Sequence, residues 1–332
     1  MKKVSVIVPM YNSENTIDEC LMSLTSQSIF NDMELLIVDD CSKDNSVLKA
    51  AAFEERYPDN IMLIKLSENG GPGRARNIAM EYAQGEYIGF VDSDDAVVPV
   101  MYEHLYEEAV RCGADVVDGG IYEQNTDNAI VYTSDDLSGK PDNEKISRLI
   151  VSGGYICSKI FRREFLISEG ISFREEYVLE DLDYILEVFC KMKMISNVKE
   201  IVYVYRDSGD SLSKTVDVDK YLHSTVTAMR SMHEKLFSLP FYEGIREAVE
   251  YVLVQLYSFS INVCLKAIRE GTQSKEKTLD SLRDLKALKR MLVKGDYDNR
   301  FILDKIGRID IEIMQQNDDD PERLIARIGE GV

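Results

Sequence analysis

The segment FVDSDDAVVP, residues 90–99, carries three carboxylates in four positions, with no Lys or Arg beside them. Asp92, Asp94 and Asp95 follow an apolar run, and carboxylates this close repel one another unless a positive partner lies between them. Mg²⁺ or Mn²⁺ is such a partner, because it takes one or two carboxylates and leaves positions for substrate phosphate. The segment therefore predicts a divalent-metal site, with a solvated acidic turn as the alternative.

Four segments rich in Val, Ile and Leu must position these carboxylates. Such short apolar runs are typical of strands buried on both faces of a parallel sheet. Helical periodicity separates them, with Asn15 expected to cap the first helix and Gly85 to end the next. Pro99 and Gly113 are expected to open and close a further helix. The pattern predicts consecutive βαβ units. The expected strands are residues 4–9, 34–40, 61–66 and 86–92.

Polar residues stand where three of these strands end. The first strand ends in Pro9-Met10-Tyr11-Asn12, the second in Asp39-Asp40, and the fourth in the acidic segment. In an open parallel α/β sheet, ligands bind beyond the carboxyl ends of the strands. We therefore expect all three groups to share one ligand-binding edge.

Composition limits the classes of partner. The chain has 332 residues, 45% of them hydrophobic, and a formal net charge of −20. Duplex nucleic acid needs clustered Lys and Arg, so the charge argues against nucleic acid as a partner. The six Cys are scattered and predict reduced thiols in a cytoplasmic protein. The start, MKKVSVIVPMYN, reads as a strand rather than a signal peptide, and no run approaches 18 apolar residues, so we expect no transmembrane segment.

With these motifs in order, the sequence resembles the family-2 glycosyltransferases, which are inverting enzymes of the GT-A fold that use nucleotide-diphosphate sugars. The resemblance implies an α/β, Rossmann-like fold with a mostly parallel central sheet flanked by helices, followed by a C-terminal helical region. It is weaker in SKIFRREFL, VLEDLDYILEVF and YVYRDSGDSLS. The stretches that carry it are VSVIVPMYNSENTIDECLMSLTSQ, ELLIVDDCSKDNS and NGGPGRARNIAMEYAQGEYIGFVDSDD, which cover most of residues 4–100.

The resemblance also implies roles for the polar residues. Asp40 would accept a hydrogen bond from the nucleotide base, in a pocket formed by Pro9 and Tyr11. Asp94 would bind the metal, Mn²⁺ or Mg²⁺, with Asp92 close to the ribose and metal. The expected nucleotide-sugar site comprises Pro9, Tyr11, Asn12, Glu14, Asp40, Arg74, Arg76, Asp92, Ser93 and Asp94.

Arg74 and Arg76 stand at a helix start after NGGPG. Backbone N–H groups at such a terminus favour anions, and an Arg there can reach a diphosphate. The alternative is that one of the two arginines pairs with the acidic cluster.

An inverting displacement needs a base that takes the proton of the acceptor hydroxyl. Glu180, Asp181 and Asp183 in LEDLDYILEVF are candidates at the start of a helix. Such acids can also be plain N-terminal caps. The family places its base at the second residue of a Glu-Asp pair, which makes Asp181 the expected base and Glu180 the second choice.

From about residue 216 the pattern is helical, so we expect a catalytic domain over residues 1–215 and a helical region over 216–332. Three helices are expected at residues 219–237, 242–268 and 278–294, and Pro321 opens a short final one. Arg206 and Lys214 lie in a polar, Gly-containing stretch that is a lid or a plain surface loop.

The helix at 282–294 has two expected faces. Its apolar side is Leu282, Leu285, Leu288, Met291 and Leu292, and its basic residues are Lys286, Lys289, Arg290 and Lys294. A basic amphipathic helix can lie on an anionic membrane, and an ordinary bundle helix shows the same pattern. Peripheral contact with the inner face of the membrane is therefore one of two interpretations.

Three functions remain open from the sequence. The first is a non-processive transferase that moves a sugar from a nucleotide sugar, UDP-linked by expectation, to a glycan or lipid-linked acceptor in surface polysaccharide or glycolipid synthesis. The chain has no Trp, so it lacks the Gln-x-x-Arg-Trp motif of processive relatives. The second is a nucleotidyltransferase, although PMYNSENT lacks the usual Gly-rich loop with Arg and Lys. The third is a non-catalytic nucleotide-sugar-binding module.

Overall fold

The computed structural model of this chain describes residues 2–175, 178–206, 217–294 and 299–301. It divides the chain into two compact units, Met1–Asp142 with Ser152–Thr215, and Asn143–Val151 with Val216–Val332. Helix α5, Asn143–Ser152, thus contributes nearly all of its length to the second unit. Asn143, the first residue of α5, packs closely against Gly244 of the second unit. A Cβ atom added to Gly244 would lie only 2.0 Å from the Asn143 side chain.

The four expected strands are present as β1 (Val4–Met10), β2 (Met33–Asp39), β3 (Ile61–Lys65) and β4 (Tyr87–Phe90). They lie in the order β3-β2-β1-β4, and every pairing among them is parallel. The prediction that the strands are buried on both faces is confirmed for β1, β2 and β4. It is wrong for β3, where Met62 is exposed, because β3 lies at the edge of the sheet.

The nine-stranded sheet continues through β8 (Lys159–Arg162), β6 (Val116–Glu123), β9 (Ile195–Tyr205) and β5 (Ala96–Val97), with β7 (Asn128–Ile130) beside β6. Strand β8 runs antiparallel to β4, with Gly89 opposite Ile160. Continuing that register brings the residues before β8 alongside the acidic segment after β4. Strand β6 runs parallel to β9, which carries Glu123 opposite Tyr205.

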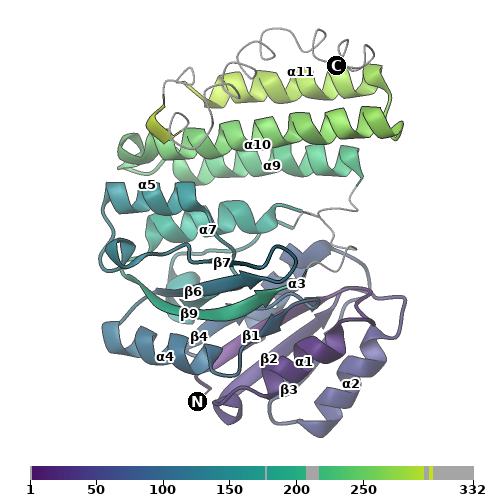
Figure 1. Cartoon of the computed structure of the whole chain (residues 1–332), viewed down its shortest axis with the longest axis vertical. Helices are drawn as coiled ribbons and strands as arrows, with labels where there is room; N and C mark the ends of the chain where they lie inside the picture. The colour runs from purple at the N-terminus through teal and green to yellow at the C-terminus, as the bar shows by residue number, and fades with distance from the viewer. Residues whose placement is uncertain (1, 176–177, 207–216, 295–298, 302–332) are drawn as a thin grey trace. The chain divides into compact units, whose positions relative to one another are not determined.

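Helices flank this sheet in the first unit (Figure 1): α1 (Ile17–Thr25), α2 (Ser46–Arg56), α3 (Gly71–Tyr82), α4 (Met101–Cys112), α6 (Arg163–Ser168) and α7 (Glu180–Lys191). The expected Asn15 cap is wrong. Thr16 is the N-cap and no side chain caps the helix, because the Ser13 carbonyl accepts from the N–H groups of Thr16 and Ile17. Helix α3 ends at Tyr82, before Gly85. Helix α4 begins two residues after Pro99, and Gly113 ends it with a φ of +67°.

The second unit contains α9 (Val218–Leu236), α10 (Tyr242–Glu270) and α11 (Lys275–Leu292), which run side by side in Figure 1. The segment around Pro321 lies outside the described residues. The expected faces of α11 are partly wrong. Lys286 and Lys289 are buried, with the Lys289 ammonium 5.0 Å from the centre of the Tyr257 ring, whereas Met291 is 68% exposed. Of the four cations expected on the surface, Arg290 and Lys294 remain exposed.

Among the described residues, one helix is long and apolar enough to cross a membrane by length and composition, namely α10. Of its most apolar window, 61% is buried within the structure, and the helix also contains the buried Glu250, which pairs with Arg246 at 3.2 Å. A core helix has the same properties, so this single candidate is weak evidence for a span.

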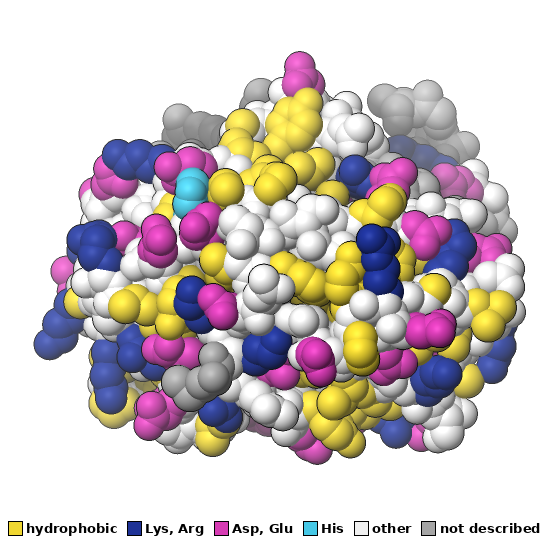
Figure 2. Space-filling model, turned by 90° about the horizontal axis from the view of Figure 1, so that it is seen from below, with side chains coloured by type: hydrophobic (Ala, Val, Ile, Leu, Met, Phe, Trp, Pro, Cys, Tyr) yellow, Lys and Arg dark blue, Asp and Glu magenta, His cyan; other side chains and the backbone are white. Residues whose placement is uncertain are grey.

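The face in Figure 2 shows acidic and basic side chains interspersed, with hydrophobic side chains between them. No field of a single sign covers the described part of this face. On this face the described residues therefore form no clustered basic surface of the kind that nucleic acid needs.

Candidate active site

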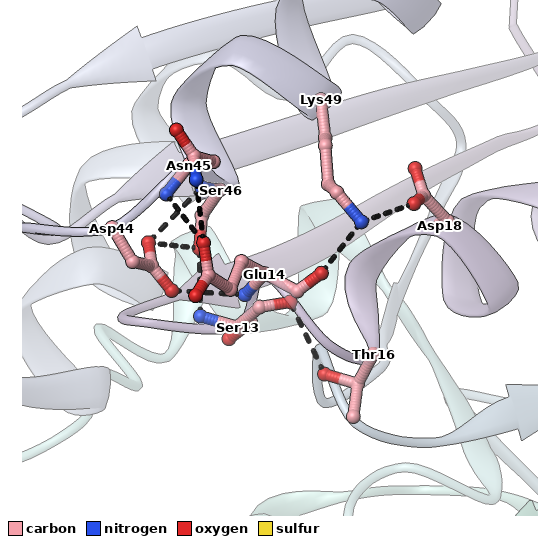
Figure 3. Close-up of polar contacts among 8 residues, drawn as sticks. All are labelled: Ser13, Glu14, Thr16, Asp18, Asp44, Asn45, Ser46 and Lys49. Atoms are coloured by element: carbon pink, nitrogen blue, oxygen red, sulfur yellow. Dashed lines mark hydrogen bonds and ion pairs between the residues drawn. The ribbon is translucent and has the colours of Figure 1, made fainter.

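The loops that follow β1 and β2 bind each other through polar contacts (Figure 3). The Glu14 N–H donates to Asp44 Oδ2 at 2.9 Å, and Glu14 Oε2 accepts from the backbone and side-chain nitrogens of Asn45 at 3.0 and 2.8 Å. Lys49 Nζ donates to the Glu14 carbonyl at 2.7 Å and to Asp18 at 2.5 Å. The carboxylate of Glu14, expected at the nucleotide-sugar site, therefore joins the two loops.

Asn12 makes a second connection between the same loops. Its side-chain oxygen accepts from the Lys43 N–H at 2.8 Å, and its own N–H donates to the Ser42 hydroxyl at 3.0 Å. Asn12 has a φ of +49°, a conformation that Asn adopts more readily than most residues. At the neighbouring end of β1, Pro9 is buried and the Tyr11 side chain is 45% exposed. Tyr11 thus has nearly half of its surface accessible to a ligand.

Asp40 ties the end of β2 to the start of α3. Its two carboxylate oxygens accept from the N–H groups of Gly70 and Gly71, each at 2.8 Å. Burial raises the pKa of this carboxyl, and the two glycine bonds oppose the rise. The Asp40 N–H also donates to the Met10 carbonyl at 2.8 Å, which places the ends of β1 and β2 at one edge. Asp40 therefore orders the glycine loop, in addition to any contact with a nucleotide.

The two arginines of α3 have different surroundings. Arg76 is 4% exposed and donates to Asp92 Oδ1 at 2.8 Å and to the buried Glu180 carboxylate. Its guanidinium lies 5.3 Å from the centre of the Phe173 ring, and its Nε has no partner. Arg74 instead pairs with Glu68 at 2.9 Å. Of the two interpretations given for these arginines, pairing with the acidic cluster describes Arg76.

The buried Asp95 anchors the acidic loop after β4 to the end of β9. This carboxyl is 1% exposed, and it accepts from the Tyr203 hydroxyl at 2.6 Å and from the Arg206 N–H at 2.7 Å. Burial raises its pKa, and the neighbouring Asp92 and Asp94 raise it further. The Ser93 and Ser13 hydroxyls hydrogen-bond at 2.7 Å. The loop is thus held to β9 and to the loop after β1.

The donor set on this loop suits a hard divalent cation. Asp92 and Asp94 are both partly exposed and offer carboxylate oxygens, which Mg²⁺ and Mn²⁺ prefer. Within the described ranges no group of three His, Cys, Asp or Glu is arranged to hold a metal. A Mg²⁺ or Mn²⁺ ion can bind through one or two carboxylates and complete its shell with substrate phosphate.

The acids of α7 separate into three environments. Asp183 is buried and pairs with Arg174 at 2.9 Å, and Glu180 is buried against Arg76. Asp181 is partly exposed, and burial followed by the charge of Glu180 raises its pKa to about 7. Leu179, directly before the helix, has a φ of +63°, a costly conformation for Leu that is common at functional sites.

The structure brings most of the predicted residues to one edge. Pro9, Tyr11 and Asp40 lie at the ends of β1 and β2, and Arg76 joins Asp92 to the start of α7. Sequence reasoning missed Tyr203, which touches the acidic loop from a buried position on β9. The signal was a phenol inside an apolar strand, since a buried Tyr hydroxyl normally finds a partner. Of the two lid residues, Arg206 contacts Asp95 and Glu19, and Lys214 lies outside the described residues.

A largely parallel sheet with an acidic loop at its carboxyl edge is an α/β architecture whose ligand site is expected at that edge. The profile described as Glycosyl transferase family 2 matches residues 5–169. Through this region the chain belongs to glycosyl transferase family 2, as the motifs predicted.

Two curated relatives and one solved structure show how far the likeness extends. The chain is 32% identical to the uncharacterized glycosyltransferase EpsJ of Bacillus subtilis, over 64% of this chain and 63% of EpsJ. It is 25% identical to the cholesterol galactosyltransferase of Borreliella burgdorferi, over 92% of this chain and 89% of that protein. The crystal structure of S. aureus TarS 1–349 in complex with UDP-GlcNAc matches with a TM-score of 0.71 at 23% identity, covering 95% of this chain and 92% of that one. The GT-A fold with C-terminal helices is confirmed.

Proposed function

We propose that this chain is a metal-dependent, inverting, non-processive glycosyltransferase that moves one sugar from a UDP-sugar to an acceptor hydroxyl. One observation carries the proposal. Arg76 binds Asp92 of the acidic loop and Glu180 at the start of α7 with a single guanidinium. It thereby brings the metal-binding candidates and the candidate base Asp181 into one site, although 104 residues separate Arg76 from Glu180.

The donor side consists of the loops after β1 and β2. Tyr11 offers a partly exposed ring, and Asp40 offers carboxylate oxygens that can accept from a base N–H in addition to the two glycine bonds. A fold like that of TarS, which was solved with UDP-GlcNAc, favours a UDP-linked donor. Asn12 and Glu14 support this pocket by joining its two loops.

In the proposed reaction Asp181 accepts the proton of the acceptor hydroxyl as that oxygen attacks the anomeric carbon. Its raised pKa, about 7, suits this task, since a base works best with a pKa near the working pH. Glu180 is paired with Arg76, which leaves Asp181 as the better base. Asp94 and Asp92 would hold Mn²⁺ or Mg²⁺, which stabilises charge on the leaving diphosphate.

The acceptor belongs by this proposal to surface polysaccharide or glycolipid synthesis, and the reaction takes place in the cytoplasm or at the inner face of the membrane. Relatives named for cholesterol galactosylation and for poly(ribitol-phosphate) glucosylation support this range. Membrane contact through residues 282–294 is the weaker part, because Lys286 and Lys289 are buried.

A thermal-shift series tests donor and metal together. UDP with Mn²⁺ is expected to raise the melting temperature by several degrees, because a ligand that binds only the folded state stabilises it. Asp94→Ala should remove most of this shift, whereas Asp127→Ala, a change in the turn between β6 and β7, should keep it. An equal shift in Asp94→Ala would contradict the metal assignment. A shift without UDP release from any UDP-sugar would favour the non-catalytic module.

A further inference from the structure

Three tyrosines form an aromatic cluster at the antiparallel side of the sheet, and no step proposed above uses them. The Tyr155 and Tyr205 rings are parallel, with centroids 6.1 Å apart and an interplanar angle of 5°. The Tyr132 ring meets the Tyr155 ring edge-on at 5.8 Å. Tyr155 is 37% exposed, so the cluster is open to solvent on one side. We call these three residues the tyrosine platform.

A buried ion pair holds the platform in place. Lys159 Nζ donates to the Tyr155 carbonyl at 2.8 Å and lies 3.0 Å from Asp118 Oδ1, and both charged side chains are fully buried. The remaining Asp118 oxygen accepts from the Thr133 hydroxyl at 2.7 Å, next to Tyr132. The backbone of Tyr155 is therefore fixed before any ligand binds, which lowers the entropic cost of binding.

The platform lies beside the candidate active site. The antiparallel register of β4 and β8 brings the chain around Tyr155 alongside the acidic loop, and Tyr205 directly precedes Arg206, whose N–H binds Asp95. The charge of Asp181 also contributes to raising the pKa of the Tyr155 hydroxyl, after burial and the charge of Glu123. The donor pocket proposed above lies at the other, parallel side, after β1 and β2.

We propose that the tyrosine platform is the acceptor subsite and that it binds a sugar ring of the acceptor. A pyranose has a face of C–H bonds that packs on an aromatic ring, and a rim of hydroxyls that needs polar partners. The platform offers the rings, and Glu123 offers a carboxylate, since it is paired with Tyr205 in the sheet and, after burial, its charge helps to raise the pKa of the Tyr132 and Tyr155 hydroxyls. This inference rests on the proposed function and narrows it to acceptors that carry a carbohydrate ring at the attacking end.

Saturation-transfer NMR with the full chain, UDP and Mg²⁺, which unlike Mn²⁺ is diamagnetic, tests the platform directly. The probes are octyl glycosides of glucose, galactose and N-acetylglucosamine, with octanol as the matched probe that lacks a sugar. At least one glycoside is expected to receive saturation on its ring protons, whereas octanol is not. Tyr155→Ala should weaken glycoside binding roughly three- to tenfold, the size of one aromatic contact. Tyr155→Phe keeps the ring and should bind like the wild type.

The matched control is Tyr82→Ala, which removes an exposed tyrosine at the far end of α3 and should change nothing. UDP binding, followed by thermal shift, should be the same in all variants. The inference is overturned if no glycoside binds the wild type, if octanol binds equally well, or if Tyr155→Ala binds like the wild type. Loss of UDP binding in Tyr155→Ala would also overturn it. Failure of the wild type to bind UDP contradicts the proposed function instead.

Discussion

Asp181 and Glu180 are neighbours with different electrostatic tasks. Glu180 is ion-paired with the buried Arg76, whereas Asp181 is only partly exposed and feels the repulsion of Glu180. Such a difference between adjacent acids is how a site keeps one carboxyl charged and tunes the other toward neutrality. It identifies Asp181 as the group with an affinity for a proton near pH 7.

Asp181→Asn is expected to reduce sugar transfer by roughly 10²–10⁴, the usual contribution of a general base, with UDP binding unchanged. Glu180→Gln is the matched comparison, because it removes the partner of Arg76 and should lower the melting temperature. Asp183→Asn should also destabilise, since it breaks the buried pair with Arg174. The rate of UDP release measures sugar transfer, and thermal melts measure stability, for all three variants. Near wild-type transfer by Asp181→Asn would remove it as the base.

The pH dependence follows from the same carboxyl. As a base Asp181 must be charged, so kcat/KM should rise with pH through about 7. Its effect on stability has the opposite sign. The folded-state pKa lies above the ordinary 3.8, so this contribution to the free energy of unfolding is complete below pH 4 and is lost as pH rises through about 7. Between about pH 4 and pH 7, the free energy of unfolding measured with urea should therefore decrease less with rising pH, or increase more, in Asp181→Asn than in the wild type. Identical slopes would contradict the raised pKa.

At the scale of elements, the acidic loop depends on β9. Tyr203 and Arg206 bind Asp95 from the end of that strand, across more than 100 residues of sequence. The loop that carries Asp92 and Asp94 is therefore positioned by a strand from a distant part of the chain.

Tyr203→Phe is expected to destabilise the fold by about 1–3 kcal/mol, the cost of leaving the buried Asp95 oxygen without its hydrogen-bond donor. It should also weaken the Mn²⁺-dependent part of UDP binding, because the loop proposed to bind the metal loses its support. Tyr122→Phe is the control, since the Tyr122 hydroxyl binds the carboxylate of Asp127 on the surface at a similar 2.8 Å. Urea unfolding and calorimetry with UDP measure both effects. Equal losses in the two variants would mean that the Asp95 contact has no special role.

The parallel strands and their polar ends were predictable because each depends on local sequence. Apolar runs define β1, β2 and β4, and the polar or acidic groups of the predicted site follow them directly. Long-range partners were not predictable. Nothing local in the sequence assigns both Asp40 oxygens to Gly70 and Gly71, or the Tyr203 hydroxyl to Asp95. The prediction of which residues face outward on α11 was partly wrong for a related reason, since Lys289 packs on Tyr257 of α10.

At the scale of the whole molecule, the chain is acidic, yet two of the lysines on α11, Lys286 and Lys289, are buried within the helical unit. Lys289→Glu is therefore expected to destabilise the protein, because it places a carboxylate at a buried position next to the Tyr257 ring. The neighbouring exposed Arg290→Glu should change the melting temperature little. Sedimentation with anionic vesicles at low salt then tests the membrane. Contact with the membrane through this helix would be supported if the wild type binds the vesicles and the single variant Arg290→Glu does not. If the wild type does not bind them, the bundle interpretation stands.

The contact between Arg76 and Glu180 has a consequence for how the chain folds. Strands β1 to β4 pair over short and intermediate separations, whereas the pairs Arg76–Glu180 and Asp95–Tyr203 close loops of more than 100 residues. Contacts of such separation form slowly because the entropy of loop closure must be overcome first. During refolding from urea, the recovery of UDP binding should therefore lag behind the recovery of secondary structure, and the lag measures the assembly of the site separately from that of the sheet.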